Sequence, residues 1–185
     1  MGRAAQHMRR LFAARRGSVY LELAAVMILM SGIFLGAAVV GSRTMDMDRS
    51  GRAIRAGIDA IWSLDDQVAA PGQSDFDAIG QRLVEIMSIG SGEAFNIIFT
   101  MIEYDHAGPG LEIDWQGNYA TTTSKSSRIS ITPPVANVDG FDFWIRDDER
   151  MVVVEIYRSR QGLFPAGELV FYTKGVVFKY DPDHL

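Results

Sequence analysis

The feature that most constrains this chain is an apolar run near its N-terminus. From Val19 to Val40 the sequence holds 22 residues, of which only Glu22 is charged. A helix of that length extends about 33 Å, enough to cross a hydrocarbon core of roughly 30 Å. The run therefore predicts one transmembrane helix. An ionisable group within such a span is costly, so Glu22 is a functional-site hypothesis that requires a partner.

A secretory signal peptide is the alternative interpretation of this run. The apolar core of a signal peptide is usually about 7 to 15 residues long and precedes a small-residue cleavage site. The run here has 22 residues, and no convincing Ala-x-Ala sequence follows it. A membrane span is therefore favoured over a signal peptide.

Charge and cysteine content exclude several classes of function. Five arginines precede the apolar run, and without them the chain has 13 basic and 23 acidic residues, a net charge of −10. Nucleic-acid binding depends on Lys and Arg neutralising phosphates, so this composition argues against it. The chain has no cysteine, which excludes disulfides, thiolate metal sites and a thiol nucleophile.

The residues before the apolar run form a specific pattern. Arg15 and Arg16 precede Gly17, Ser18 follows it, and Glu22 is the fifth residue after the glycine. This pattern resembles the processing site of a type IV pilin-like precursor. Within that superfamily it is most similar to the start of TadE/TadG-like proteins, the minor pilins (pseudopilins) of tight-adherence (Tad) pili.

The resemblance implies how the pattern is used. Prepilin peptidase would recognise the leader at Arg15 and Arg16 and cut after Gly17, so that Ser18 becomes the first residue of the mature chain. Glu22 would then pair with the new N-terminal amine of its own or a neighbouring subunit. The implied function is that of a minor pilin in pilus assembly or priming, in a Tad pilus or a related secretion machine.

The same resemblance implies partners and a location. The partners would be prepilin peptidase, other major and minor pilin subunits, the inner-membrane assembly platform and the lipid bilayer, with no nucleic acid and no cofactor. The protein would be a single-pass protein of the bacterial inner membrane with its C-terminal domain in the periplasm. Incorporation into an extracellular pilus is a further expectation, and the arginine-rich leader agrees with a cytoplasmic N-terminus.

The span itself and the residues after it carry further signals. Gly32 and Gly36 form a small-xxx-small pair, which permits close helix packing but is also common by chance in membrane helices. Beyond Gly41 an apolar stripe at helical spacing predicts an amphipathic continuation of the helix to Ala70. Pro71-Gly72 is expected to end it.

A change of periodicity marks the remainder of the chain. Ser74 is predicted to cap a second, shorter helix whose apolar stripe ends near Gly90. Strands are then predicted over 94–104, 111–115, 128–132, 151–157, 169–173 and 176–180. Turns are expected at 108–110, 116–118 and 133–134, and Lys174-Gly175 is expected to connect the last two strands as a hairpin.

A search for catalytic or metal-binding groups identifies no convincing constellation. The three histidines are scattered along the sequence, at positions 7, 106 and 184. Asn137, Asp139 and Asp142 have alternating oxygen ligands but lack the distal Glu of a calcium loop, so turn capping is favoured. No enzymatic activity and no metal site are therefore expected.

Together these patterns predict an α+β fold with four segments. They are a basic leader over 1–17, a transmembrane and assembly helix over 18–41, its amphipathic continuation over 42–70, and a periplasmic or extracellular domain over 71–185. A pilin-like arrangement of a long N-terminal helix, a second short helix and a mostly antiparallel sheet is expected. The alternatives are an uncleaved single-span protein whose outer domain binds a ligand or regulates a partner, and a tethered exported enzyme.

Overall fold

The computed structural model describes the backbone of residues 2–65, 71–90, 93–105, 110–121, 125–146, 149–161 and 168–180. The chain divides into two compact units, Met1–Asp46 and Met47–Leu185. The first helix, α1, covers Gly2–Asp65 and so contributes to both units. The expected helix end near Ala70 and the expected turn residues 108 and 109 lie outside the described residues.

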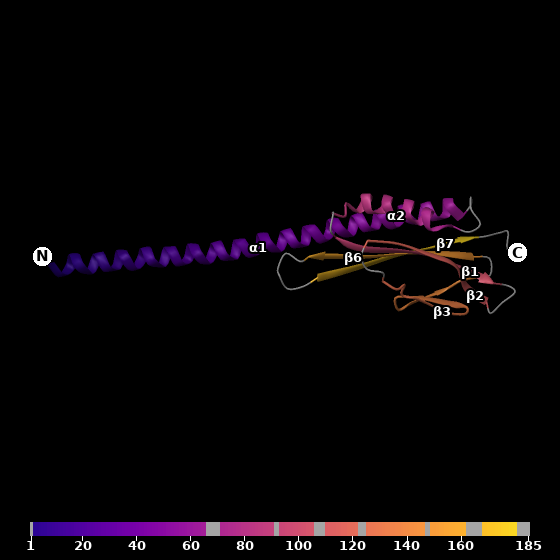
Figure 1. Cartoon of the computed structure of the whole chain (residues 1–185). Coiled ribbons are helices and arrows are strands. Elements are labelled where there is room, and N and C mark those ends of the chain that lie inside the picture. Colours follow the sequence, from indigo (N-terminus) through magenta and orange to yellow (C-terminus); the bar gives the residue numbers. More distant parts are fainter. Residues whose placement is uncertain are drawn as a thin grey trace. The chain divides into compact units, whose positions relative to one another are not determined.

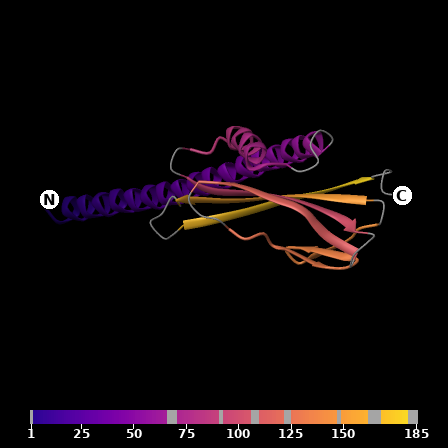
Figure 2. The ribbon, with the colours of Figure 1, turned by 45° about the vertical axis from the view of Figure 1, so that its right-hand side comes forward.

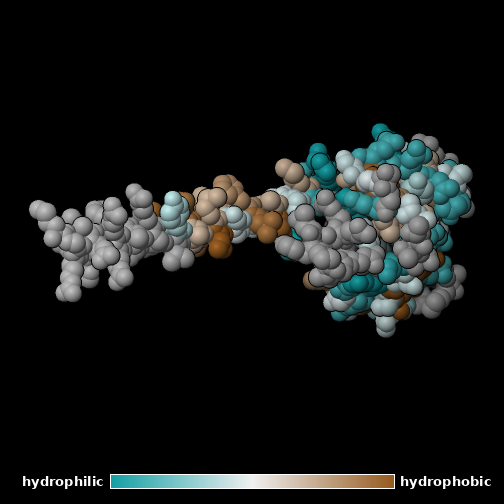
Figure 3. All heavy atoms as spheres, turned by 60° about the vertical axis from the view of Figure 1, so that its left-hand side comes forward, coloured by the Kyte–Doolittle hydropathy of each residue, from teal (hydrophilic) through white to brown (hydrophobic). Residues whose placement is uncertain are grey.

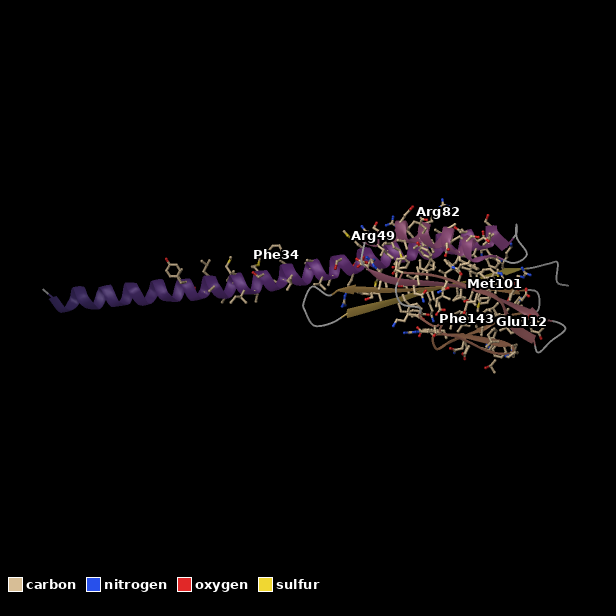
Figure 4. All side chains as sticks on the ribbon, viewed as in Figure 1. Phe34, Arg49, Arg82, Met101, Glu112 and Phe143 are labelled. Atoms are coloured by element: carbon tan, nitrogen blue, oxygen red, sulfur yellow. The ribbon has the colours of Figure 1, made fainter. Side chains whose placement is uncertain are left out.

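In the first unit, every described residue is helical. Ala, Leu and Met are frequent in α1 and favour the helix, and the segment contains no proline. Over residues 19–46, the large apolar side chains that the structure describes face outward, and Phe34, labelled in Figure 4, is 67% exposed. Figure 3 shows hydrophobic side chains gathered on this part of the helix.

In its described residues, the second unit contains the rest of α1, a second helix and seven strands. The elements after α1 are α2 (Gln73–Met87), β1 (Ala94–Asp105), β2 (Gly110–Ala120), β3 (Ile129–Thr132), β4 (Val135–Val138), β5 (Phe141–Trp144), β6 (Glu149–Gln161) and β7 (Glu168–Tyr180). All pairs among the described strands are antiparallel, in one sheet of order β2-β1-β6-β7 and a smaller one of order β3-β4-β5. The predicted α+β fold class is confirmed.

Within this unit, the larger sheet is the middle of three layers (Figures 1 and 2). One face packs against α1 and α2 through a cluster that includes Ile61, Leu83 and Phe99. The other face packs against the small sheet through a second cluster that includes Val138 and Val153. Because β1 and β6 are covered on both faces, apolar residues occupy successive positions in them, such as Ile97, Ile98 and Phe99 in β1, instead of strictly alternating positions.

Two glycines that were predicted to lie in turns lie instead inside strands. A Cβ on Gly175 would be 2.0 Å from Cγ2 of Ile54 in α1, and a Cβ on Gly117 would be 2.2 Å from the ring of Phe76 in α2. Both positions therefore permit close approach of a helix to the sheet. The predicted hairpin at Lys174-Gly175 and the predicted turn at 116–118 are wrong, because β7 and β2 continue through them.

Two local details also differ from expectation. The N-cap of α2 is Gly72 and not Ser74, and the backbone N–H of Gly72 donates to Oδ2 of Asp75 at 2.9 Å.

Strands β4 and β5 were not predicted. They form a hairpin around Asp139 and Gly140, which have φ values of 51° and 82°, the positive values that a two-residue hairpin turn requires. The predicted turn at Pro133-Pro134 is confirmed between β3 and β4.

Candidate functional site

The predicted processing region lies within α1. Gly17, Ser18 and Glu22 have helical backbone, without a break between them. Residues four apart on a helix lie on the same face about one turn apart, so positions 18 and 22 are neighbours along the helix surface. The side chains of Arg15, Arg16 and Ser18 lie outside the described residues.

Glu22 lies among outward-facing apolar side chains. Tyr20 is 72% exposed and Leu23 is 59% exposed, and the side chain of Glu22 is itself exposed. Among the described helices, only α1 contains a stretch long and apolar enough to cross a membrane, with a mean hydropathy of 2.5 and none of that window buried. This stretch, which lies near the N-terminus, is compatible with a single-pass membrane anchor.

The glycine pair of the span has an open surface. A Cβ added at Gly32 or Gly36 would have no heavy atom within 4 Å beyond its own helix. Hydroxyls nearby are bound within α1, since Ser31 Oγ donates to the carbonyl of Met27 at 2.7 Å and Thr44 Oγ1 donates to that of Val40 at 3.0 Å. This part of α1 thus presents apolar and small side chains outward, and the hydroxyls of Ser31 and Thr44 are bound to carbonyls of the helix itself.

The second unit contains a buried polar cluster that the sequence analysis did not identify. Its centre is Glu155 on β6, which is completely buried and faces the small sheet. Tyr172 on β7 donates to Oε1 of Glu155 at 2.9 Å, and Tyr157 donates to the same atom at 3.4 Å. Glu155 is the only charged residue in the run Met151–Tyr157, and this was the available signal.

The four residues before β3, which we call the strap (Lys125–Arg128), are hydrogen-bonded to this cluster. Ser127 Oγ donates to Oε2 of Glu155, and the backbone N–H of Arg128 donates to Oε1 at 3.0 Å. The carbonyl of Lys125 accepts a hydrogen bond from Asn96 Nδ2 at 2.9 Å. The carbonyl of Ser126 lies 3.1 Å from the Tyr157 hydroxyl and shares its single proton with Oε1 of Glu155. Each strap residue is therefore bound by a side chain of the large sheet.

The side chain of Arg128 covers the two tyrosines of the cluster. Its guanidinium carbon lies 4.4 Å from the centre of the Tyr172 ring and 5.7 Å from that of the Tyr157 ring. The guanidinium also forms an ion pair with Asp139, with 2.9 Å between Nη1 of Arg128 and Oδ1 of Asp139. Burial, reinforced by the Glu155 charge, raises the pKa of Tyr157 to about 12 and also raises the pKa of Tyr172. Both hydroxyls therefore remain protonated donors to Glu155 at neutral pH.

The residues considered for calcium binding make contacts in and around the β4–β5 turn. Asn137 Oδ1 accepts from the backbone N–H of Gly140 at 3.0 Å, and Asn137 Nδ2 donates to Asp142 at 2.5 Å. Asp139 pairs with Arg128. The amide of Asn137 thus caps the β4–β5 turn, as favoured from the sequence.

Comparisons with protein-family models, with curated proteins and with solved structures find no match to this chain.

Proposed function

We propose that this chain is a minor pilin (pseudopilin) subunit of a Tad-type pilus or a related secretion machine, processed by prepilin peptidase. The observation that carries the proposal is the five-residue spacing from Gly17 to Glu22 at the start of an apolar helix whose side chains face outward. A single-span anchor alone requires an apolar helix but not this spacing. The α+β domain after the helix agrees with such a subunit.

The proposed mechanism depends on a charge that appears only on cleavage. Cutting after Gly17 would create an amine on Ser18, one helical turn from the carboxylate of Glu22 in the same chain. Within a low-dielectric environment a carboxylate is stabilised by a nearby cation. The amine of Ser18, from the same or a neighbouring subunit, would supply that cation and align subunits as they leave the membrane.

The rest of the molecule has a complementary role in this proposal. The span would hold the precursor in the inner membrane with its domain in the periplasm, where that domain contacts other subunits. The outward-facing apolar helix would lie first in lipid and then among the helices of neighbouring pilins. Gly32 and Gly36, where added Cβ atoms would meet nothing, would permit close helix approach there.

A substitution at the cleavage site tests the proposal. In cells that contain prepilin peptidase, the native chain should lose its leader, and a Gly17→Leu chain should retain it because the resemblance implies a cut directly after this glycine. The two products differ by 17 residues and separate on a gel. A native chain that keeps its leader in the presence of an active peptidase would support the uncleaved single-span alternative.

A further inference from the structure

The strap is bound in the way that a peptide ligand is bound. Along Lys125–Arg128, two carbonyls, one hydroxyl and one backbone N–H each have a partner on the large sheet. The partners are the side chains of Asn96, Glu155 and Tyr157, from β1 and β6. Three of these four contacts are with backbone groups, which most sequences could supply.

A separate part of the cluster binds the strap's cation. The rings of Tyr157 and Tyr172 have centres 4.9 Å apart, and the guanidinium of Arg128 lies over both. Planar guanidinium groups stack on aromatic rings, and the neighbouring Asp139 adds an ion pair at 2.9 Å. The cluster thus selects an arginine directly after the residue whose hydroxyl reaches Glu155.

The strap leaves one polar atom of the cluster unmatched. Asn96 is only 1% exposed, and its Oδ1 has no hydrogen-bond partner, although its Nδ2 binds the strap. Buried acceptors without a partner are uncommon in folded proteins. The strap therefore does not exhaust the hydrogen-bonding capacity of the cluster, and a different segment could use this oxygen as well.

We propose that Asn96, Glu155, Tyr157 and Tyr172 form a peptide-binding site that the strap occupies in cis. The ligand class is a peptide segment of another subunit with a serine followed by an arginine. The strap is tethered between the end of β2 at Ala120 and the start of β3 at Ile129, so its effective concentration at the site is on the order of millimolar. A partner segment binds measurably only when it exceeds this competition or when the strap is weakened.

The test measures binding of a labelled peptide to the full-length protein in detergent micelles. The peptide has the sequence of residues 123–130, and the control peptide carries alanine in place of the serine and glutamate in place of the arginine that match Ser127 and Arg128. In the Ser127→Ala/Arg128→Ala variant, the strap loses its hydroxyl and guanidinium contacts. We expect fluorescence anisotropy to show about tenfold tighter binding of the peptide to this variant than to the native chain.

Two further variants keep the test decisive. Adding Tyr172→Phe, which retains the ring but removes the hydroxyl that contacts Glu155, should weaken peptide binding to the strap variant. Arg128→Ala alone, a milder change, should show the same direction of effect if the double variant does not fold. Near-UV circular dichroism establishes folding in each case.

Binding that is equal in the native chain and in a folded strap variant, or equal for the two peptides, would overturn the proposal. The hydrogen bonds of the strap would then only stabilise the fold. Because the protein is produced in cells without prepilin peptidase, the result does not depend on cleavage after Gly17. The peptide-binding site and the proposed pilin function can therefore fail separately.

Discussion

The hydroxyl of Tyr172 donates a 2.9 Å hydrogen bond to Oε1 of Glu155 on the adjacent strand. Ser127 and the backbone N–H of Arg128 also donate to this fully buried carboxylate, and the single proton of the Tyr157 hydroxyl is shared between it and the carbonyl of Ser126. A buried carboxylate is tolerated where hydrogen bonds replace its hydration. The contact thus connects β6 and β7 to the strap through a single charge.

Glu155→Ala should lower the free energy of unfolding by about 2–4 kcal/mol, because it leaves three part-buried donors, the hydroxyls of Tyr172 and Ser127 and the backbone N–H of Arg128, without this acceptor. Urea denaturation of the protein in micelles measures this loss. Glu112→Gln, at an exposed position, is the matched control and should change stability by less than about 0.5 kcal/mol. An equally small effect at Glu155 would contradict the role given to the cluster.

Alkaline pH should destabilise the native chain through Tyr157 and Tyr172. The folded state raises the pKa of Tyr157 from 10.0 to about 12 and also raises that of Tyr172. The stability that this contributes is complete below pH 10, and it is lost as pH rises toward the folded pKa because only the unfolded state releases the protons.

Thermal unfolding between pH 8.5 and 11.5 checks this dependence, with tyrosinate absorbance recorded in parallel. A Tyr157→Phe/Tyr172→Phe chain should show a smaller decline over the same interval. If both chains declined equally above pH 10, the two hydroxyls would not be the source of the dependence.

Gly175→Ala should destabilise the domain by about 1–3 kcal/mol, the usual cost of overpacking. The new Cβ would lie 2.0 Å from Cγ2 of Ile54, so α1 or β7 must move. Gly51→Ala in α1 is the opposite control, because a Cβ there meets nothing within 4 Å. It should stabilise the helix by up to about 1 kcal/mol, and urea midpoints compare the two. Equal midpoints would argue against close packing of α1 on β7.

These glycines also show where sequence reasoning succeeded and failed. Helices and strands were predicted correctly where an apolar period was long, as in α1 and in the run Met151–Tyr157. Gly117 and Gly175 were assigned to turns because glycine commonly marks turns. In the structure they accommodate Phe76 and Ile54 from helices far away in the sequence, and no local pattern contains that information.

The buried cluster was missed for a related reason. Asn96, Glu155 and Tyr172 come from separate parts of the chain and are brought together by the pairing of β1, β6 and β7, while Ser127 is added by the strap. The isolated Glu155 in an apolar run indicated a buried charge, but its partners could not be inferred. The pattern around Gly17, in contrast, is contiguous in sequence, so the hypothesis that rests on it needs no tertiary contacts.

Glu22→Gln should leave processing largely intact but reduce incorporation into pili by about tenfold or more, because it removes one partner of an ion pair in a low-dielectric environment. Quantitative immunoblotting of sheared pili and of membranes measures the two fractions. Glu85→Gln, on the exposed side of α2, is the control and should assemble normally. Normal assembly of the Glu22→Gln chain would exclude the proposed pairing with the Ser18 amine.

The most direct test of the central claim is the N-terminal residue of membrane-extracted protein, determined by mass spectrometry from cells with and without prepilin peptidase. The proposed function predicts Ser18 as the first residue only in cells that contain the peptidase. An N-terminus that starts at Met1 in both kinds of cell would contradict it.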